Sequence, residues 1–248
     1  MLPSALPRKP KGEDAQSGVY MIQDVNLTRN DPDKLLKRGQ IKYLRFNEIL
    51  PKSIEEGPRP SGAVWNGAPK RLLGTVPVEP DGSVVVRVPA GVPLQIQALD
   101  ENFMAVMTER SFHYLHPGER RGCVGCHEPL GTSLKPDASL FTRKPKTLTP
   151  PVGQNDGLGL SFLKMVQPVL DKNCIGCHDV GPDSAKNKVH LVSNPGKGFP
   201  AAYGRLRGYA SCIGNKNDTH GLQKNISRPM DYYAHASKLI PILKDAPQ

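Results

Sequence analysis

Four of the chain's five cysteines lie in two short segments, RGCVGCHEP and KNCIGCHDV, each with the pattern Cys-x-x-Cys-His. Two thiols at this spacing can reach the vinyl groups on two neighbouring pyrroles of a porphyrin, and the histidine that follows can bind the iron. The pattern is typical of c-type haem attachment. The sequence therefore predicts two covalently bound haem c groups, held by Cys123, Cys126, His127, Cys174, Cys177 and His178. His127 and His178 are the expected iron ligands.

Two other kinds of site use paired cysteines. Zinc is held by four Cys or His ligands in a tetrahedron, but residues 127–173 separate the two pairs, whereas zinc pairs more often lie about 15–20 residues apart. Zinc also leaves the histidine after each pair unexplained. A thioredoxin-type dithiol expects one Cys-x-x-Cys in a βαβ unit, and the chain has two without that alternation. Haem attachment is the preferred hypothesis, and a zinc-stabilised binding module stays open.

The ligand on the opposite side of each iron decides what the haem does. Methionine raises the reduction potential, histidine lowers it, and an open position permits chemistry on a substrate. The candidates near the first motif are Met104, Met107, His113 and His116. Both methionines lie in a predicted strand, so a role in the core is the expectation for them.

Near the second motif the candidate ligands are His190, His220 and His235. We prefer His235 as the ligand opposite His178 on the second iron, because it lies in a segment predicted to be helical. The expected metal ligands are then His127, His178 and His235. Arg120 and Arg121 could pair with haem propionates, although a solvated charge pair is the default. Cys212, the fifth cysteine, is expected to be an inert thiol.

Short strands and frequent turns are expected in the first half of the chain. Glycine and proline, with 24 and 25 of 248 residues, make up about a fifth of the sequence, against roughly 12% on average. Strands are predicted at 19–25, 41–49, 76–78, 84–88, 94–98 and 103–107. Turns about every ten residues favour an antiparallel sandwich or a partial barrel. The buried face of the strand at 41–49 is ambiguous.

Helices are expected in the second half. Apolar residues recur at helical spacing from Phe162 to Leu170, Ser161 is a plausible N-cap, and Pro168 predicts a kink or two consecutive short helices. A further helix, MDYYAHASKLIPILK, is expected near the end of the chain, interrupted at Pro241.

These elements predict an α+β fold, in which a β-rich, sandwich-like middle domain precedes a small, mostly α, cytochrome c-like domain. The expected divisions are a loose N-terminal segment at 1–17, the β-rich domain at 18–128, a Pro/Gly-rich linker at 129–160, and the cytochrome c-like domain, shortened at its end, at 161–248.

The chain is basic, with 33 Lys and Arg against 23 Asp and Glu and a formal net charge of +10. The basic residues are scattered and no nucleic-acid motif accompanies them, so an acidic redox protein is the preferred partner and nucleic acid is not expected. No apolar run approaches the roughly 18 residues of a membrane span, and the first residues lack the apolar core of a signal peptide. The oligomeric state is not predictable from the sequence.

Much of the sequence resembles the middle and C-terminal parts of hydrazine synthase alpha-subunit-like proteins, which are multihaem proteins known from anammox bacteria and other planctomycetes. The resemblance spans roughly residues 18–243 and is carried by GVYMIQDV, KRGQIKYLRFNEI, GTVPVEPDGSVVVRVPAGVPLQIQALDENFMAV, PGERRGCVGCHEP and VQPVLDKNCIGCHD. It implies that the first haem site corresponds to the catalytic one of the synthase and the second to an electron-passing one.

Three departures from the family pattern stand out. In the synthase, a tyrosine four residues after the first motif's histidine binds the catalytic iron, and here that position is Gly131. Relatives carry an export signal and a propeller-like region before this part, and they continue into a histidine-containing segment where this chain ends in ILKDAPQ. We therefore expect a piece of a longer protein. Since thioether attachment of haem takes place outside the cytoplasm, the intact protein is expected in the periplasm or another extracytoplasmic compartment.

The favoured function is electron transfer by a dihaem c-type cytochrome. The alternatives are a haem-dependent redox enzyme related to the hydrazine synthase alpha subunit and the zinc-stabilised module. The chain on its own is not expected to be an enzyme, because it contains no evident Ser/His/Asp set, phosphate-binding loop or carboxylate pair.

Overall fold

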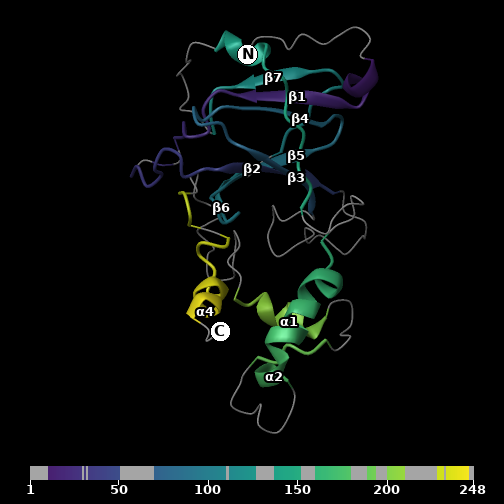
Figure 1. Ribbon diagram of the computed structural model, residues 1–248, viewed down its shortest axis with the longest axis vertical. Coiled ribbons are helices and arrows are strands. Elements are labelled where there is room, and N and C mark those ends of the chain that lie inside the picture. Colours follow the sequence, from purple (N-terminus) through teal and green to yellow (C-terminus); the bar gives the residue numbers. More distant parts are fainter. Residues whose placement is uncertain are drawn as a thin grey trace, which may run out of the picture.

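Two β-sheets form one part of the molecule and a group of short helices forms the other (Figure 1). The computed structural model describes residues 11–29, 31, 33–50, 70–109, 112–126, 137–151, 160–179, 189–193, 200–209, 228–231 and 233–245. The strands are β1 (Ser17–Ile22), β2 (Tyr43–Ile49), β3 (Lys70–Pro77), β4 (Val84–Pro89), β5 (Leu94–Leu99), β6 (Ala105–Thr108) and β7 (Arg120–Cys123). They form two sheets, ordered β4-β1-β7 and β3-β2-β5-β6.

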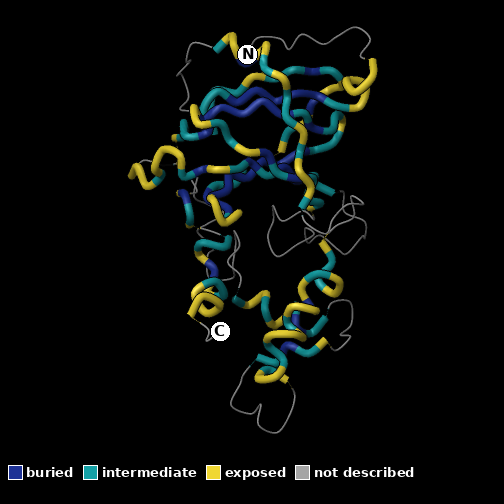
Figure 2. Tube along the Cα trace, in the orientation of Figure 1, coloured by how far each residue is buried: buried dark blue, intermediate teal, exposed yellow. Residues whose placement is uncertain are grey.

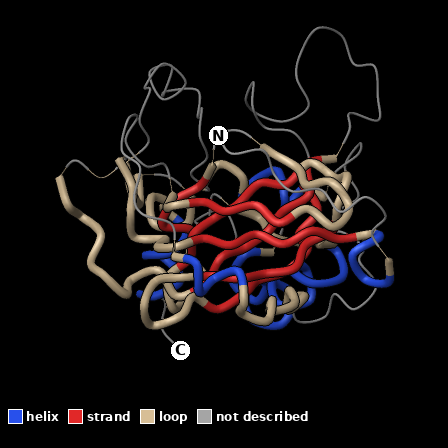
Figure 3. The backbone as a smooth tube through the Cα atoms, turned by 90° about the horizontal axis from the view of Figure 1, so that it is seen from above, coloured by secondary structure: helices blue, strands red, loops and turns tan. Residues whose placement is uncertain are grey.

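The main hydrophobic core lies between the two sheets. Strands of the two sheets run in roughly the same direction when viewed from above (Figure 3), as in an aligned sandwich. Tyr20, Leu44, Phe46, Val86 and Leu94 are fully buried and belong to one cluster drawn from both sheets. Figure 2 shows buried residues concentrated along these strands.

The predicted strands are confirmed, and the ambiguous face of β2 is resolved. Leu44 and Phe46 point into the core, while Tyr43 and Arg45 are only partly buried. The α+β class with a β-rich first part is therefore confirmed. The expectation of purely antiparallel pairing is wrong in one place, because β7 pairs in parallel with β1. The sequence analysis missed β7, which is short and contains two arginines and a glycine.

The predicted linker at 129–160 is described over residues 137–151 and 160, and much of it lies on the sheets. Thr149 exchanges backbone hydrogen bonds with Thr75, at 2.8 and 2.9 Å. Leu140 is buried beside Val19 and Met21 on the side of the first sheet that faces away from the main core. A single turn of 3-10 helix, Ala138–Phe141, begins this segment. Residues of the predicted linker therefore pack on both sheets, and the domain divisions stay a prediction.

The other part of the molecule consists of short helices. After a π-helical turn at Phe162–Val166 come α1 (Gln167–Asn173), α2 (Ile175–His178), α3 (Ala201–Leu206) and α4 (Leu239–Asp245). The Ser161 hydroxyl accepts a hydrogen bond from the backbone N–H of Lys164 (3.3 Å), which confirms the predicted N-cap. Pro168 lies at the start of α1, where its missing N–H costs nothing, so the predicted pair of short helices is also confirmed.

The helix predicted near the end of the chain is wrong over its first half. Residues 233–236 form turns, and α4 begins only at Leu239. Met230 and Tyr233 adopt positive φ angles of 64° and 62°, which interrupt a helix, and the Met230 N–H donates to the Val106 carbonyl (2.8 Å) instead of to a helical neighbour. Pro241 does not break α4, because it lies in the first turn.

No helix within the described ranges combines the length and apolar character that crossing a membrane requires.

Replacing Phe46 by alanine tests the inter-sheet core. Its ring is fully buried, so Phe46→Ala is expected to lower the free energy of unfolding by about 3–5 kcal/mol. Urea denaturation measures this loss. Phe112→Ala is the matched control, since that ring is 57% exposed, and it is expected to change stability by less than about 0.5 kcal/mol. Equal losses for the two variants would contradict this packing.

Candidate functional site

The first Cys-x-x-Cys segment begins inside the sheet. Cys123 is the last residue of β7 and lies beside Ile22 of β1. The pairing continues past both strands, with the Gln23 N–H donating to the Cys123 carbonyl (2.9 Å) and the Asp24 N–H to the Val124 carbonyl (3.0 Å). Cys123 and Cys126 are partly buried and pack against the main core. One strand pairing therefore fixes the backbone of this motif, and both thiols lie at the margin of the core.

Gly125 lies directly against the loop that follows β1. A Cβ atom at this position would clash with the Leu27 carbonyl oxygen and come within 2.7 Å of the Leu27 side chain. Only glycine therefore allows the two backbones to approach this closely.

Asp24 organises that loop. Its Oδ1 accepts hydrogen bonds from the Asn26 backbone N–H (3.0 Å) and side-chain amide (2.8 Å), and its Oδ2 pairs with Arg38 (2.7 Å). Partial burial by itself would raise the pKa of Asp24, but the hydrogen bonds from Arg38 and Asn26 outweigh it and hold the pKa below the ordinary carboxyl value. The loop that contacts the first motif thus depends on an ionised Asp24.

The second motif lies on helical turns. Cys174 separates α1 from α2, and its carbonyl accepts hydrogen bonds from the N–H groups of Cys177 (3.2 Å) and His178 (2.9 Å). Cys174 is partly buried, Cys177 is exposed, and all four motif cysteines are thiols. Gly176 has no neighbour within 4 Å of where a Cβ would lie. In contrast to Gly125, this glycine is not required by local packing.

His178 has a defined tautomer. Its Nδ1 lies 2.9 Å from the Val189 carbonyl oxygen, and because a carbonyl only accepts, Nδ1 must carry the proton. The lone pair of the neutral ring is then on Nε2. Histidines that bind metals usually donate their other ring N–H to a carbonyl or a carboxylate in this way. His178 is therefore oriented as an iron ligand would be.

The segment at 189–193, which contacts His178, forms hydrogen bonds with both α2 and α1. The Leu191 N–H donates to the His178 carbonyl (2.8 Å), and the buried Gln167 amide donates to the Leu191 carbonyl (2.9 Å) and to Asp171 (2.7 Å). The ring of Phe162 contacts Tyr203 edge-on at 5.5 Å, which joins α3 to the same group.

This helical group exposes an unusual number of large apolar side chains. Six of them are between 40% and 57% exposed: Leu160, Leu163, Val166, Val169, Ile242 and Leu243. Between residues 160 and 209, only Gln167, Leu191 and Ala202 of the described residues are buried. The group therefore has a small core and apolar surface that a bound group could cover.

The two cysteine pairs do not converge. Within the described ranges, no three His, Cys, Asp or Glu side chains come together as a metal site. A joint zinc site made of Cys123, Cys126, Cys174 and Cys177 therefore does not form. His127 lies outside the described residues, as do Gly131, Cys212 and His220.

Two sixth-ligand candidates near the first motif have other roles. Both ring nitrogens of His113 are engaged, Nδ1 by the Tyr20 hydroxyl and Nε2 by Glu109 (3.1 Å). Met107 packs against the main core, as predicted, whereas Met104 lies just before β6 and not within it. His116 is exposed.

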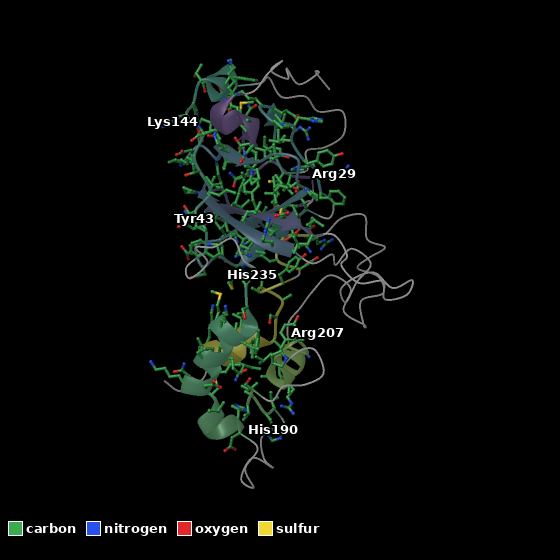
Figure 4. All side chains as sticks on the ribbon, turned by 90° about the vertical axis from the view of Figure 1, so that its right-hand side faces the viewer. Arg29, Tyr43, Lys144, His190, Arg207 and His235 are labelled. Carbon is green, nitrogen blue, oxygen red and sulfur yellow. The ribbon has the colours of Figure 1, made fainter. Side chains whose placement is uncertain are left out.

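His190 and His235, the two described candidates near the second motif, lie apart from each other (Figure 4). The Nδ1 of His190 contacts the Asp179 carbonyl. His235 lies in a turn and not on the predicted helix, with its Nε2 3.1 Å from Asp100 Oδ2 at the end of β5. The Nε2 and Oδ2 atoms do not meet with hydrogen-bond geometry. They form an ion pair only when the imidazole is protonated. His235 as an iron ligand stays a prediction.

Two residues near the first motif, Tyr20 and Glu119, had no predicted role, and the structure brings them into contact with His113 and Arg121. Tyr20 and Glu119 are fully buried, and Arg121 binds the Glu119 carboxylate through Nη2 (2.7 Å) and Nε (3.0 Å). Arg120 donates to the Phe141 carbonyl (3.1 Å). No local pattern could have revealed the Tyr20–His113 contact, because the two residues are far apart in the chain.

Comparisons with known proteins agree with this architecture. Residues 39–128, ending just after the first motif, match the family model described as the hydrazine synthase alpha subunit middle domain. Hydrazine synthase subunit alpha of Kuenenia stuttgartiensis is 41% identical in an alignment covering 58% of this chain and 25% of the relative. A solved K. stuttgartiensis hydrazine synthase shares the fold, with a TM-score of 0.57 at 20% identity, over 79% of this chain and 34% of that one. The chain thus spans about a quarter to a third of these relatives, and the predicted resemblance is confirmed.

The two motif glycines provide a matched pair of substitutions. Gly125→Ala forces a Cβ into the backbone at Leu27, and it is expected to lower the free energy of unfolding by more than about 1 kcal/mol. Gly176→Ala has open space in a helix, where alanine is favoured by roughly 0.5–1 kcal/mol. Thermal or urea unfolding distinguishes the two, and a larger loss for Gly176→Ala would contradict the contact.

Replacing Asp24 by asparagine tests the carboxylate in the supporting loop. The depressed pKa means that ionised Asp24 stabilises the fold above the ordinary carboxyl value of 3.8, and that this stability is lost as the pH falls through the lower folded value. Asp24→Asn is therefore expected to be less stable than wild type at neutral pH, and the difference should shrink in acid. Unfolding curves recorded across this range measure it. A deficit that does not change with pH would mean that the charge is not responsible.

Proposed function

We propose that this chain, a hydrazine synthase alpha-subunit-like protein, holds two covalently bound haem c groups and serves in electron transfer. Cys123 and Cys126 would hold the first group, with His127 as the iron ligand, and Cys174, Cys177 and His178 the second. When bound, haem c supplies a one-electron iron couple whose potential depends on the axial ligands, hydrogen bonds and burial. The protein's task is to bind, orient and shield these groups.

The single observation that carries the proposal is the hydrogen bond from His178 Nδ1 to the Val189 carbonyl. It presents the Nε2 lone pair, it holds the ring at one angle, and it makes the imidazole a better donor.

The surroundings of the second motif support the same assignment. A helical group with few buried residues is marginal on its own, and the exposed apolar side chains of the helices offer a surface that a porphyrin could cover. We propose that this group is the cytochrome c-like unit and that haem completes its core.

The first motif supports haem differently. Its thiols lie at the margin of a preformed core, and Gly125 and the β1–β7 pairing fix their spacing. Partial burial would raise the free-energy cost of a net charge on the iron. It would also shield one face of the haem from water.

A haem-dependent redox enzyme is the second candidate, favoured by the match of residues 39–128 to the hydrazine synthase alpha middle domain. Gly131 in place of the family's tyrosine argues against the same chemistry at the first iron. A six-coordinate, low-spin spectrum for both irons would support electron transfer, and an open position at the first iron would support the enzyme.

The net charge of +10 supports an acidic redox protein as partner, because long-range attraction raises association rates. Such steering weakens as salt is added. We further propose an extracytoplasmic location for the intact protein, where haem attachment by thioether bonds takes place.

Haem content tests the proposal directly. Protein made with a cytochrome maturation system is expected to contain two covalent haems per chain by pyridine haemochrome assay and intact mass. Cys123→Ser/Cys126→Ser and Cys174→Ser/Cys177→Ser should each lose one. Cys212→Ser, outside both motifs, is the control and should keep two. An intact mass equal to that of the polypeptide, or zinc without iron by elemental analysis, would overturn the proposal.

A further inference from the structure

A hydrogen-bonded chain of three side chains runs from the core beside the first motif to the surface. Tyr20, fully buried on β1, donates its hydroxyl proton to Nδ1 of His113, and the Nε2–H of His113 donates to Glu109 Oε1 at 3.1 Å. The side chains of His113 and Glu109 are 27% and 29% exposed. These three hydrogen-bonded side chains thus connect the buried Tyr20 phenol to solvent.

Each member of this chain is held in place. His113 exchanges backbone hydrogen bonds with Leu94 of β5, at 2.8 and 3.1 Å. Glu109 Oε2 accepts from the Ile96 backbone N–H (2.8 Å). The rings of Tyr20 and His113 lie 5.0 Å apart. Since backbone hydrogen bonds position His113 and Glu109, the three side chains have one defined arrangement.

Tyr20, the buried end of this hydrogen-bonded series, lies close to the first motif. Tyr20 pairs with Arg121 on β7, two residues before Cys123, and paired residues of parallel strands point to the same side of a sheet. Burial raises the pKa of Tyr20, so the phenol stays protonated, and Cys123 and Glu119 act in the same direction while Arg121 opposes them. The neutral Tyr20 hydroxyl therefore donates to His113 while Nδ1 of that ring is unprotonated, and it can accept a hydrogen bond once Nδ1 carries a proton.

We propose that His113 is a redox-linked proton acceptor for the first haem site and binds one proton from solvent when that site gains one electron. The inference rests on the proposed function, because it requires haem at Cys123 and Cys126. The electron comes from a chemical reductant or an acidic redox partner and converts ferric to ferrous iron. The proton comes from solvent and ends on Nδ1, the unprotonated nitrogen of the neutral ring, and the Tyr20 hydroxyl turns from donor to acceptor.

The charges around His113 explain why this ring would take the proton. An added negative charge nearby favours the imidazolium, and its effect is larger in a partly buried site than in water. Glu109 stabilises the imidazolium, whereas donation by Tyr20 stabilises the neutral ring. Arg121, which faces the same region, is neutralised by Glu119 at 2.7 Å. His113 thus contacts one group that favours its neutral form and one that favours its protonated form.

The test is the midpoint potential of the two-haem protein as a function of pH, from about pH 5 to 9. The wave of the first haem is identified as the one lost in Cys123→Ser/Cys126→Ser. In wild type its potential is expected to fall as pH rises through a window near neutrality, with one proton bound per electron. His113→Gln, which cannot titrate, should flatten that window.

Two further variants should move the window in opposite directions. Tyr20→Phe removes the donor that stabilises the neutral ring, so the window should shift to higher pH. Glu109→Gln removes the negative charge that stabilises the imidazolium, so the window should shift to lower pH. His116→Gln, at an exposed histidine nearby in the chain, is the matched control and should leave the wild-type curve unchanged.

Three results would overturn the inference. One is a potential of the first haem that does not depend on pH in wild type. Another is a full pH dependence in His113→Gln, which would place the proton elsewhere, for example on a haem propionate. The third is the absence of covalent haem at Cys123 and Cys126, which would overturn the proposed function as well, whereas the first two would leave it standing.

Discussion

The parallel pairing of β1 with β7 is the constraint on which the rest of the first site depends. Parallel neighbours need a long connection, and here that connection is most of the β-rich domain, so the first motif can take its place only when the sandwich has formed. The pairing continues to Asp24 and brings the Cys123–Cys126 backbone against the loop at Leu27. It also sets Cys123 and Tyr20 on the same side of the sheet. The positions of Cys123 and Tyr20 thus have a common origin in this pairing.

The two Cys-x-x-Cys-His motifs achieve the same spacing by different local structures. The first begins on a strand, and tertiary contacts at Gly125 hold it. The second lies on helical turns, held by hydrogen bonds to the Cys174 carbonyl and by the bonds of His178 to Val189 and Leu191. Covalent attachment needs two thiols at a fixed separation and does not need one secondary structure. The backbone of the first motif therefore depends on strand pairing between distant parts of the sequence. The backbone of the second depends mainly on residues close to it in sequence.

The sequence allowed good prediction wherever a pattern was local. Alternating valines and leucines located the core strands, and Ser161 and Pro168 predicted the start of the helical group. Non-local pairings escaped prediction, because β7 becomes a strand only through β1 and Tyr20 meets His113 only through the sandwich. The helix expected around His235 failed for the same reason. Its apolar spacing is helical, but Met230 and Tyr233 adopt positive φ angles, and the Met230 N–H bonds the Val106 carbonyl of the β-rich part instead of a helical neighbour.

These contacts limit how far the helical group can move relative to the β-rich part. Electron transfer between two fixed groups depends on their separation, and a helical group joined to the sheets at one point could swing. The chain returns to the sheets after α3, where Met230 bonds Val106, Arg228 pairs with Asp33 (2.9 Å) and His235 faces Asp100. This return gives the helical group a second attachment to the β-rich domain. If His235 also served as an iron ligand through Nε2, it would have to leave Asp100, so ligation at the second iron and anchoring of this segment would compete for one nitrogen.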